Sequence, residues 1–375
     1  MRRQTLLLGT IGLALLLPLV VVVLVKVAYG GGTPVASQQL GPARFDAEVA
    51  ATLELPPGCV TVSADGRVFF DTHPFAGPER FDAPHVWELV EGAAVPWPSA
   101  EAQADFVAPF GLTTHDGRLW LTEPATLDRS ATRLLSYDLA SGERVAEHAL
   151  PDGVARFAQD LRVSPDGRFL VLADTGAFRL TAGQLVVVDA RSGEVVRTFR
   201  HPSLDARDTI IRRFDGAPHR VAWGLLTFQV GVDGLTFSAD GRWLVYATMS
   251  SDTLHRLPAG LLLDPAVTDA ELAAAVEVVG RKPQSDGIAT DGDRVLVTDV
   301  ERGGLVSIGM DGDAFRVTDL PDVVWTDSVE VGRDGTIWVT DSAIPAYLQP
   351  LMTPPPREVL DSAGPYHLYA VRRSP

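Results

Sequence analysis

The chain beyond its first forty residues repeats one pattern of apolar and polar positions six times. In each copy a short strand with alternating apolar residues leads into an Asp-Gly pair, and a strongly apolar strand follows. Asp-Gly between two apolar runs predicts a β-hairpin, because the tight turn needs a positive φ that glycine adopts at little steric cost. The six turn aspartates are Asp65, Asp116, Asp166, Asp240, Asp291 and Asp334.

The spacing of these turns predicts an all-β fold, a six-bladed β-propeller. Most intervals are near the roughly 40 to 50 residues that one four-stranded blade occupies. The long interval holds an insertion at residues 201–231, and a second insertion, rich in proline, covers residues 343–364. The sixth copy has only three strands, so we predict that residues 46–54 supply its outer strand and close the ring. One helix is predicted inside the propeller, at residues 269–275.

The N-terminus carries a different pattern. Residues 4–25 contain no charge and follow Arg2 and Arg3. A stretch of about 20 apolar residues can cross a bilayer as a helix, and arginines before it keep the N-terminus in the cytoplasm. We therefore predict a signal anchor at residues 1–29, a linker at 30–43 and an extracytoplasmic, periplasmic or cell-surface propeller at 44–375. A cleaved signal peptide, with secretion of the protein, is the alternative.

Composition and missing motifs narrow the function. Lys and Arg total 32 against 48 Asp and Glu, a formal net charge of -16, which excludes nucleic acid as a natural partner. The single cysteine, Cys59, allows no internal disulfide and is predicted to be a buried, inert thiol. His73, His201 and His255 are predicted to be solvated, since they fall at strand ends or in loops. No nucleophile elbow, His-Glu-x-x-His, Cys-x-x-Cys or phosphate-binding loop is present.

The candidate site comes from aligning the six innermost strands, which line the central channel of a propeller. At the mouth, where these strands begin, successive copies carry Gly58, Phe110, Gln159, Asp233, Asp286 and Asp327. The next position carries Cys59, Gly111, Asp160, Gly234, Gly287 and Ser328. Four carboxyl groups are thus expected around one narrow opening.

Several interpretations of these carboxyl groups are open. Each aspartate could satisfy local backbone donors in an Asx-turn. Clustered like charges otherwise need a cation or raised pKa values. Gln159, Asp233 and Asp286 are candidate ligands of a divalent cation such as calcium. A protonated amine could instead bind against the ring of Phe110. The predicted ligand-binding set is Phe110, Gln159, Asp160, Asp233, Asp286 and Asp327, and the catalytic candidates are Asp233, Asp286 and Asp327.

Several ordered motifs resemble the yellow/major royal jelly protein family. They include Gln159-Asp-Leu161, Ser250 to Leu263, Gln284-Ser-Asp-Gly-Ile288, Asp299-Val-Glu-Arg302 and Trp325-Thr-Asp-Ser328. The resemblance spans about residues 50–372 and implies a secreted six-bladed propeller. It does not imply one activity, because members include proteins linked to dopachrome conversion, channel binders of biogenic amines and nutritive proteins.

A more distant resemblance is to gluconolactonase-like propellers, which hold a divalent metal with one Glu, two Asn and one Asp. By position Asp286 matches the Asp, Asp233 and Gln159 replace the asparagines, and Gly58 lies near the place of the Glu. The resemblance implies a metal-assisted lactonase whose ligand set is altered in this chain.

Three functions follow as expectations. The first is a monomeric, membrane-anchored propeller that binds a small cationic or aromatic molecule in its channel. The second is an enzyme that acts through the channel aspartates, either a metal-dependent lactonase or hydrolase or a dopachrome-tautomerase-like enzyme. The third is a protein-interaction scaffold, which the fold alone does not exclude.

Overall fold

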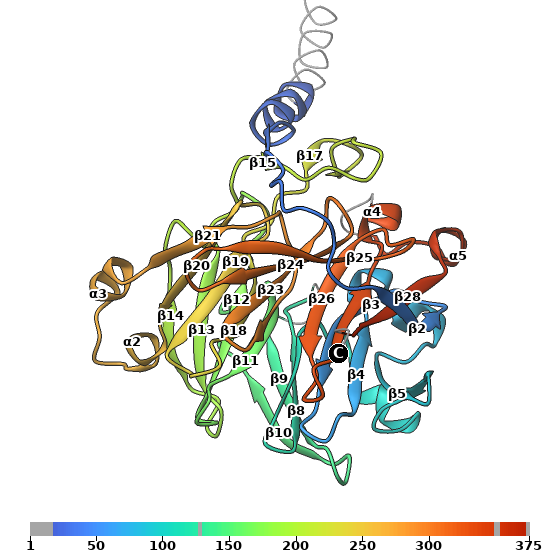
Figure 1. The fold of residues 1–375 in the computed structure, drawn as a ribbon, viewed down its shortest axis with the longest axis vertical. Coiled ribbons are helices and arrows are strands. Elements are labelled where there is room, and N and C mark those ends of the chain that lie inside the picture. Colours follow the sequence, from blue (N-terminus) through green and yellow to red (C-terminus); the bar gives the residue numbers. More distant parts are fainter. Residues whose placement is uncertain (1–17, 127–129, 349–352, 373–375) are drawn as a thin grey trace, which may run out of the picture.

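Six four-stranded antiparallel sheets form a ring in the computed structural model, which describes residues 18–126, 130–348 and 353–372 (Figure 1). Blade one consists of β3 (Pro57–Val62), β4 (Val68–Thr72), β5 (Val86–Val90) and β6 (Ala93–Pro96). Blade two consists of β7 (Leu112–His115), β8 (Arg118–Glu123), β9 (Arg133–Asp138) and β10 (Arg144–Ala149). Blade three consists of β11 (Ala158–Val163), β12 (Phe169–Asp174), β13 (Gln184–Asp189) and β14 (Val195–Phe199).

The other three blades complete the ring. They are β18 (Val232–Phe237), β19 (Trp243–Thr248), β20 (Thr253–Pro258) and β21 (Glu277–Arg281); β22 (Ile288–Asp291), β23 (Arg294–Asp299), β24 (Gly304–Gly309) and β25 (Ala314–Asp319); and β26 (Thr326–Val331), β27 (Ile337–Asp341), β28 (Tyr366–Val371) and β2 (Ala47–Leu53). The innermost strands β3, β7, β11, β18, β22 and β26 each lie beside the next around the channel. The predicted six-bladed propeller is confirmed.

The Asp-Gly turns form the first hairpin of each blade, as predicted. Gly167 has a φ of +74°, the left-handed region that only glycine adopts without strain. In the same turn the Ser164 hydroxyl donates to Asp166 Oδ1 at 2.6 Å and accepts from the Phe169 amide at 2.9 Å. Side-chain bonds therefore replace the ladder where the chain reverses.

The ring closes through β2, as predicted for residues 46–54. This strand precedes blade one in the sequence but pairs antiparallel with the last strand, so that Ala47 faces Val371 and Leu53 faces Tyr366. Ala51 turns inward and is buried, whereas Val49 is exposed. Blade six thus combines both ends of the propeller in one four-stranded sheet.

The prediction of a single helix is confirmed at α3 (Asp269–Ala274) but is incomplete. A Thr268–Glu271 capping box starts α3. The described residues also form α2 (Ala259–Leu263), α4 (Ile344–Tyr347) and α5 (Arg357–Ala363), with short 3₁₀ helices at Pro74–Ala76, Pro78–Phe81 and Glu101–Asp105. Both α4 and α5 lie in the proline-rich insertion, where proline is tolerated in or before the first turn of a helix.

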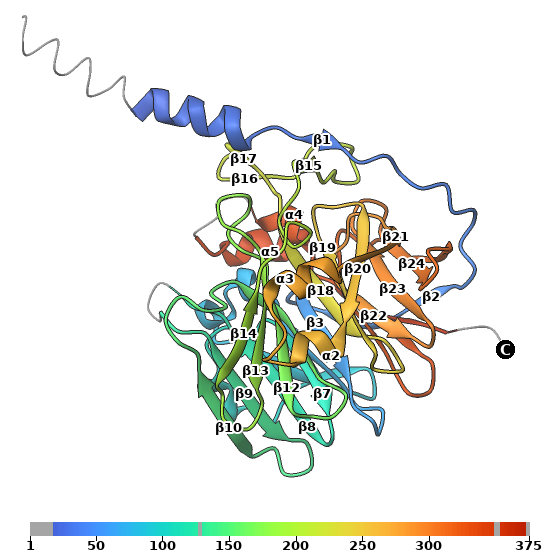
Figure 2. The ribbon, with the colours of Figure 1, turned by 90° about the vertical axis from the view of Figure 1, so that its left-hand side faces the viewer.

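Both insertions cover the same mouth of the channel, and we call their described residues, 201–231, 343–348 and 353–364, the cap (Figure 2). The first forms β15 (Thr209–Ile210), β16 (Arg220–Val221) and β17 (Leu226–Thr227), and the second forms α4 and α5. They share one apolar cluster with Trp325 of blade six; its members from the cap include Ile211, Val221, Phe228, Ile344, Tyr347 and Leu360.

The described part of the N-terminal segment is a helix over residues 18–29. The chain then runs into β1 (Thr33–Pro34), which pairs in parallel with β15 of the cap. In the ranges that the structure describes, no helix is both long and apolar enough to span a membrane. Residues 1–17 of the predicted signal anchor lie outside those ranges, so the anchor stays a prediction.

Candidate functional site

The structure brings the three aspartates of the mouth together beneath the cap. Asp233, Asp286 and Asp327 lie at the start of neighbouring inner strands and are 5%, 7% and 9% exposed. Phe110 and Gln159, from the opposite side of the ring, are half-buried. Gln159 Nε2 donates to Thr175 Oγ1 at 3.4 Å, and the Phe110 ring lies 5.5 Å from that of Phe75.

Asp233 and Asp286 form a hydrogen-bonded carboxyl pair. Burial raises the pKa of both groups well above the usual range, and the negative charge of Asp327 adds to the shift. The Trp325 indole donates to Asp286 Oδ2 at 2.6 Å. Two buried carboxyl groups in contact do not both ionise at neutral pH, so the pair holds at least one proton.

Trp325 makes this pair asymmetric. A hydrogen bond to an ionised carboxylate favours its charge, and the indole donates to Asp286 alone. Asp233 Oδ2 is buried and has no hydrogen-bond partner among the described residues. The hydrogen bond between the two carboxyl groups acts in the other direction, since it lowers the pKa of Asp233 and raises that of Asp286, so either carboxyl group can carry the proton of the pair.

Asp327 lies in contact with a neutral histidine. Its Oδ2 is 3.8 Å from His73 Nε2, and burial raises its pKa to about 7. Burial lowers the pKa of His73 to about 3, so the imidazole is uncharged at neutral pH and the contact is not an ion pair. The carboxyl group therefore changes its charge in the physiological pH range.

The prediction of solvated histidines is wrong for His73 and His255, which are 4% and 6% exposed. His73 caps the 3₁₀ helix at Pro74–Ala76, with Nδ1 accepting from the Phe75 amide at 3.1 Å, and this helix is covered by the cap. His255 stacks on the Tyr246 ring at 5.5 Å within blade four. His201 is half-buried. His73 is buried because the cap covers its helix, and His255 is buried because it lies inside β20, between β19 and β21, and not at a strand end.

Asp71 is a site residue that the alignment of inner strands missed. It lies on β4, the second strand of blade one, and a Cβ on Gly58 would lie 2.5 Å from its Oδ1. Its carboxyl group thus fills the space of the side chain that Gly58 lacks. The one sequence feature that could have identified it is an aspartate at the end of the apolar run Val68-Phe69-Phe70.

The carboxyl group of Asp71 is buried with few polar groups around it. It is fully buried, and neither oxygen has a hydrogen-bond partner of good geometry in the described ranges, although the amides of Gly58 and Cys59 face it. Burial and the charge of Asp327 raise its pKa well above the usual range. Burial therefore favours the protonated form of Asp71 in the folded protein.

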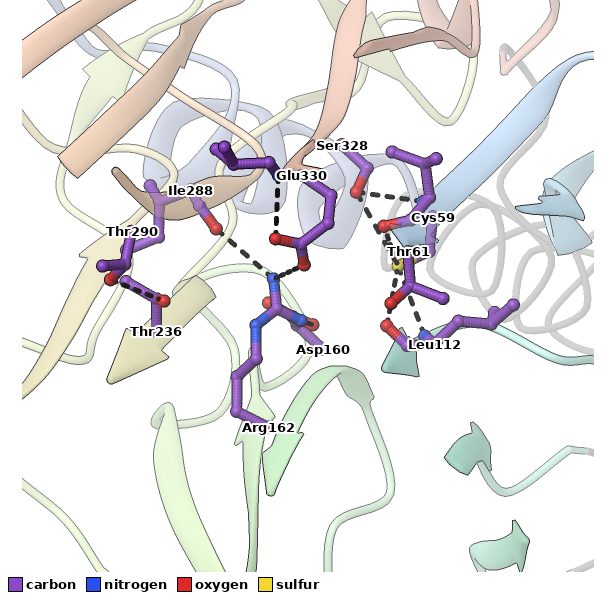
Figure 3. Close-up of polar contacts among 12 residues, drawn as sticks. Cys59, Thr61, Leu112, Asp160, Arg162, Thr236, Ile288, Thr290, Ser328 and Glu330 are labelled. Atoms are coloured by element: carbon purple, nitrogen blue, oxygen red, sulfur yellow. Dashed lines mark hydrogen bonds and ion pairs between the residues drawn. The ribbon is translucent and has the colours of Figure 1, made fainter. Parts of the chain in front are cut away.

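Asp160, by contrast, is paired and belongs to the floor of the site. It accepts from Arg162 Nη1 at 2.8 Å and from the amides of Leu161 and Leu235. The guanidinium extends across the channel, with Nη2 3.4 Å from the Ile288 carbonyl and 3.9 Å from Glu330 Oε2 (Figure 3). Arginine keeps its proton in proteins, so this contact is an ion pair despite the burial of Asp160. Arg162 closes the channel below the aspartates.

Cys59 lies beside this floor as a buried free thiol, as predicted. Burial raises the pKa of the thiol well above its usual range, and Ser328 Oγ lies 3.7 Å from Sγ (Figure 3). A thiol without thiolate character is a poor nucleophile.

The predicted metal ligands do not fit a divalent cation in this geometry. Within the ranges that the structure describes, no three His, Cys, Asp or Glu side chains converge as a metal site requires. Of the proposed ligands, Asp286 is engaged by Trp325 and Asp233, and Gln159 by Thr175. The chemistry available to the site is that of carboxyl groups which hold and exchange protons.

Comparison with known proteins shows the fold. No family model and no curated protein matches the chain. Among solved structures, a gluconolactonase from Xanthomonas campestris has a TM-score of 0.54 at 13% identity, covering 92% of this chain and 97% of its own. A protein provisionally named a gluconolactonase scores 0.53 at 15% identity, covering 88% and 93%. A streptogramin B lyase scores 0.50 at 13%, covering 88% and 99%. The chain is thus a propeller like those of gluconolactonases. The finer resemblance to the yellow/major royal jelly family stays a prediction.

Proposed function

We propose that this protein is a hydrolase that opens a small cyclic ester in its channel, with Asp233 and Asp286 as general acid and general base. The observation that carries the proposal is the buried, proton-sharing pair oriented by Trp325. A base and an acid held side by side at neutral pH are what addition of water to a carbonyl group needs. The likeness of the fold to propellers named gluconolactonase supports this class of substrate.

The proposed reaction returns both groups to their starting states. Asp286 takes a proton from water as the oxygen attacks the ester carbonyl, and Asp233 gives its proton to the carbonyl oxygen. When the tetrahedral intermediate collapses, the ring C–O bond breaks and the leaving oxygen takes the proton from Asp286. The hydroxyl proton of the intermediate returns to Asp233, and the product is a hydroxy acid.

The test is hydrolysis of a panel of lactones by the purified protein, followed by pH titration. We expect Asp233→Asn and Asp286→Asn each to lower kcat by about 10² to 10⁴-fold, the usual contribution of one acid or base. Trp325→Phe should raise the lower apparent pKa of the kcat profile, since it removes the donor to Asp286. Asp105→Asn, at an exposed position away from the channel, is the matched control and should keep the full rate. Hydrolysis that survives in both pair variants contradicts the proposal.

A second candidate function is favoured by a different observation, the surplus of unpaired carboxyl groups. Asp71 and Asp327 both have buried oxygens without partners, and the ring of Phe110 lies 5.3 Å from that of His73 beside them. A protonated amine would supply the missing donors, with cation–π contact to the aromatic rings. A thermal-shift panel of amines separates the two functions: stabilisation that Asp71→Asn removes, without lactone hydrolysis, favours binding.

A further inference from the structure

The tip of the β16–β17 hairpin, in the cap, presents an apolar side chain that the propeller does not use. Trp223 is 86% exposed, more than any other large apolar side chain in the described residues. Ala222 and Trp223 both have positive φ values, 51° and 54°. Non-glycine residues in this region are uncommon, and nothing in the propeller is gained by placing an indole there. The arrangement points to a surface that Trp223 contacts outside the molecule.

The hairpin tip is bound to the N-terminal helix. Lys26 Nζ donates to the Gly224 carbonyl, next to Trp223. Further along, Gln229 Nε2 donates to the Gly31 carbonyl at 3.4 Å, and β1 pairs with β15. The helix over residues 18–29 therefore leaves the molecule at the cap (Figure 2).

That helix exposes apolar side chains on the same side of the molecule. Leu19, Leu24 and Val27 are 59%, 61% and 76% exposed. Leu19 and Leu24 belong to the uncharged stretch of residues 4–25, the longest in the chain, and Val27 follows Lys26 directly after it. The contact of Lys26 with the Gly224 carbonyl thus holds the exposed indole near the exposed apolar side chains of residues 18–29.

The charge of the cap suits an anionic surface better than the rest of the chain does. Residues 201–231 contain four arginines and three aspartates, and no lysine or glutamate. The second segment of the cap adds one arginine, one aspartate and one glutamate, so the cap as a whole is neutral in a chain of net charge -16. Tryptophan with flanking Lys and Arg is typical of chain segments at the membrane–water interface.

We propose that the cap docks on a lipid bilayer, with Trp223 in the interfacial layer and the channel mouth toward the membrane. The N-terminal segment would then not be a loose tether, because the hairpin fixes the orientation of the propeller. A substrate or ligand of the channel would reach the site at the lipid surface, beneath the cap.

The test places a label at the hairpin tip of the full chain in lipid vesicles. Because Cys59 is buried, Trp223→Cys can be labelled selectively with an environment-sensitive fluorophore. Val145→Cys is the matched control: it is also apolar and 47% exposed, on β10 at the far end of the molecule in both views (Figures 1 and 2). Lipids with a nitroxide near the headgroup should quench the label at position 223 and not the one at 145.

Equal, weak quenching at the two positions overturns the proposal. A second result would also overturn the proposal. If the label at position 223 is shielded from water in detergent without quencher lipid, and more so at higher protein concentration, the partner of the hairpin tip is a second copy of the chain. Hydrogen exchange of the backbone amides of residues 220–227, measured on the unlabelled protein with Trp223 in place, controls for an effect of the label itself. Exchange should be slower in vesicles than in detergent, and Trp223→Ser should remove the difference.

Discussion

Asp71 carries a cost for the folded state that its neighbours do not remove. Burial and the charge of Asp327 raise its pKa above the value of about 4 that an unfolded aspartate has. A carboxyl group with a raised folded pKa contributes its full stability below the unfolded pKa and loses it as the pH rises through the folded pKa. The free energy of unfolding that depends on Asp71 therefore falls above about pH 4.

We predict that Asp71→Asn stabilises the fold, and more so at pH 8 than at pH 5. The amide keeps the shape of the side chain and cannot ionise, so the variant should gain about 1–3 kcal/mol at pH 8. Urea unfolding at both pH values measures the difference from wild type, in which the other titrating groups cancel.

Asp341→Asn is the contrasting variant, because Asp341 accepts hydrogen bonds from the amides of Val324, Trp325 and Ala343. It should lose stability at both pH values. If Asp71→Asn is no more stable than wild type at pH 8, the carboxyl group of Asp71 has a partner that this account lacks.

At this scale the sequence predicted part of the site. Asp233, Asp286 and Asp327 share one position in the repeat, so alignment was enough to bring them together. Asp71 lies on the second strand of its blade, and Trp325 lies just before an inner strand. Only the packing of the blades places these two residues at the mouth. Asp160 was predicted as a ligand-binding residue, which stays a prediction; the structure adds its bond to Arg162, two residues along the same strand.

The strands of the propeller could be predicted from the sequence because each blade carries its own local sequence pattern. Alternating apolar residues and Asp-Gly turns predict hairpins without reference to the rest of the chain. The helices α4 and α5 have no such local pattern: they are four and seven residues long and pack on the cap cluster. Helices that short depend on tertiary contacts for their stability.

Closure of the ring by β2 can be tested with two substitutions on that strand. Ala51 of β2 is 5% exposed and packs with Val60 and Leu368, while Val49 on the same strand is 43% exposed. Ala51→Glu buries a charge at the junction of the two ends and should cost about 2–4 kcal/mol. Val49→Glu should cost under about 0.5 kcal/mol. Denaturant midpoints measure both, and equal effects would contradict the closure of the ring by β2.

The whole molecule is an uneven ring whose channel is covered by the cap at one mouth and crossed by Arg162 below the aspartates. Blades four to six carry the mouth aspartates, blade one adds Asp71 from its second strand, and Arg162 of blade three blocks the channel below. The sequence predicted this asymmetry from the repeat. It could not show that both insertions cover the same mouth, since the direction of a loop depends on contacts far apart in the chain.

The proposed mechanism requires that Asp233 and Asp286 hold one proton between them at neutral pH. Infrared spectroscopy of the wild-type protein at pH 7 should show the carbonyl stretch of protonated carboxylic acid groups. The difference spectrum against an Asp233→Asn, Asp286→Asn double variant should contain one protonated carboxyl group and one carboxylate. Two carboxylates and no protonated group in that difference would contradict the account.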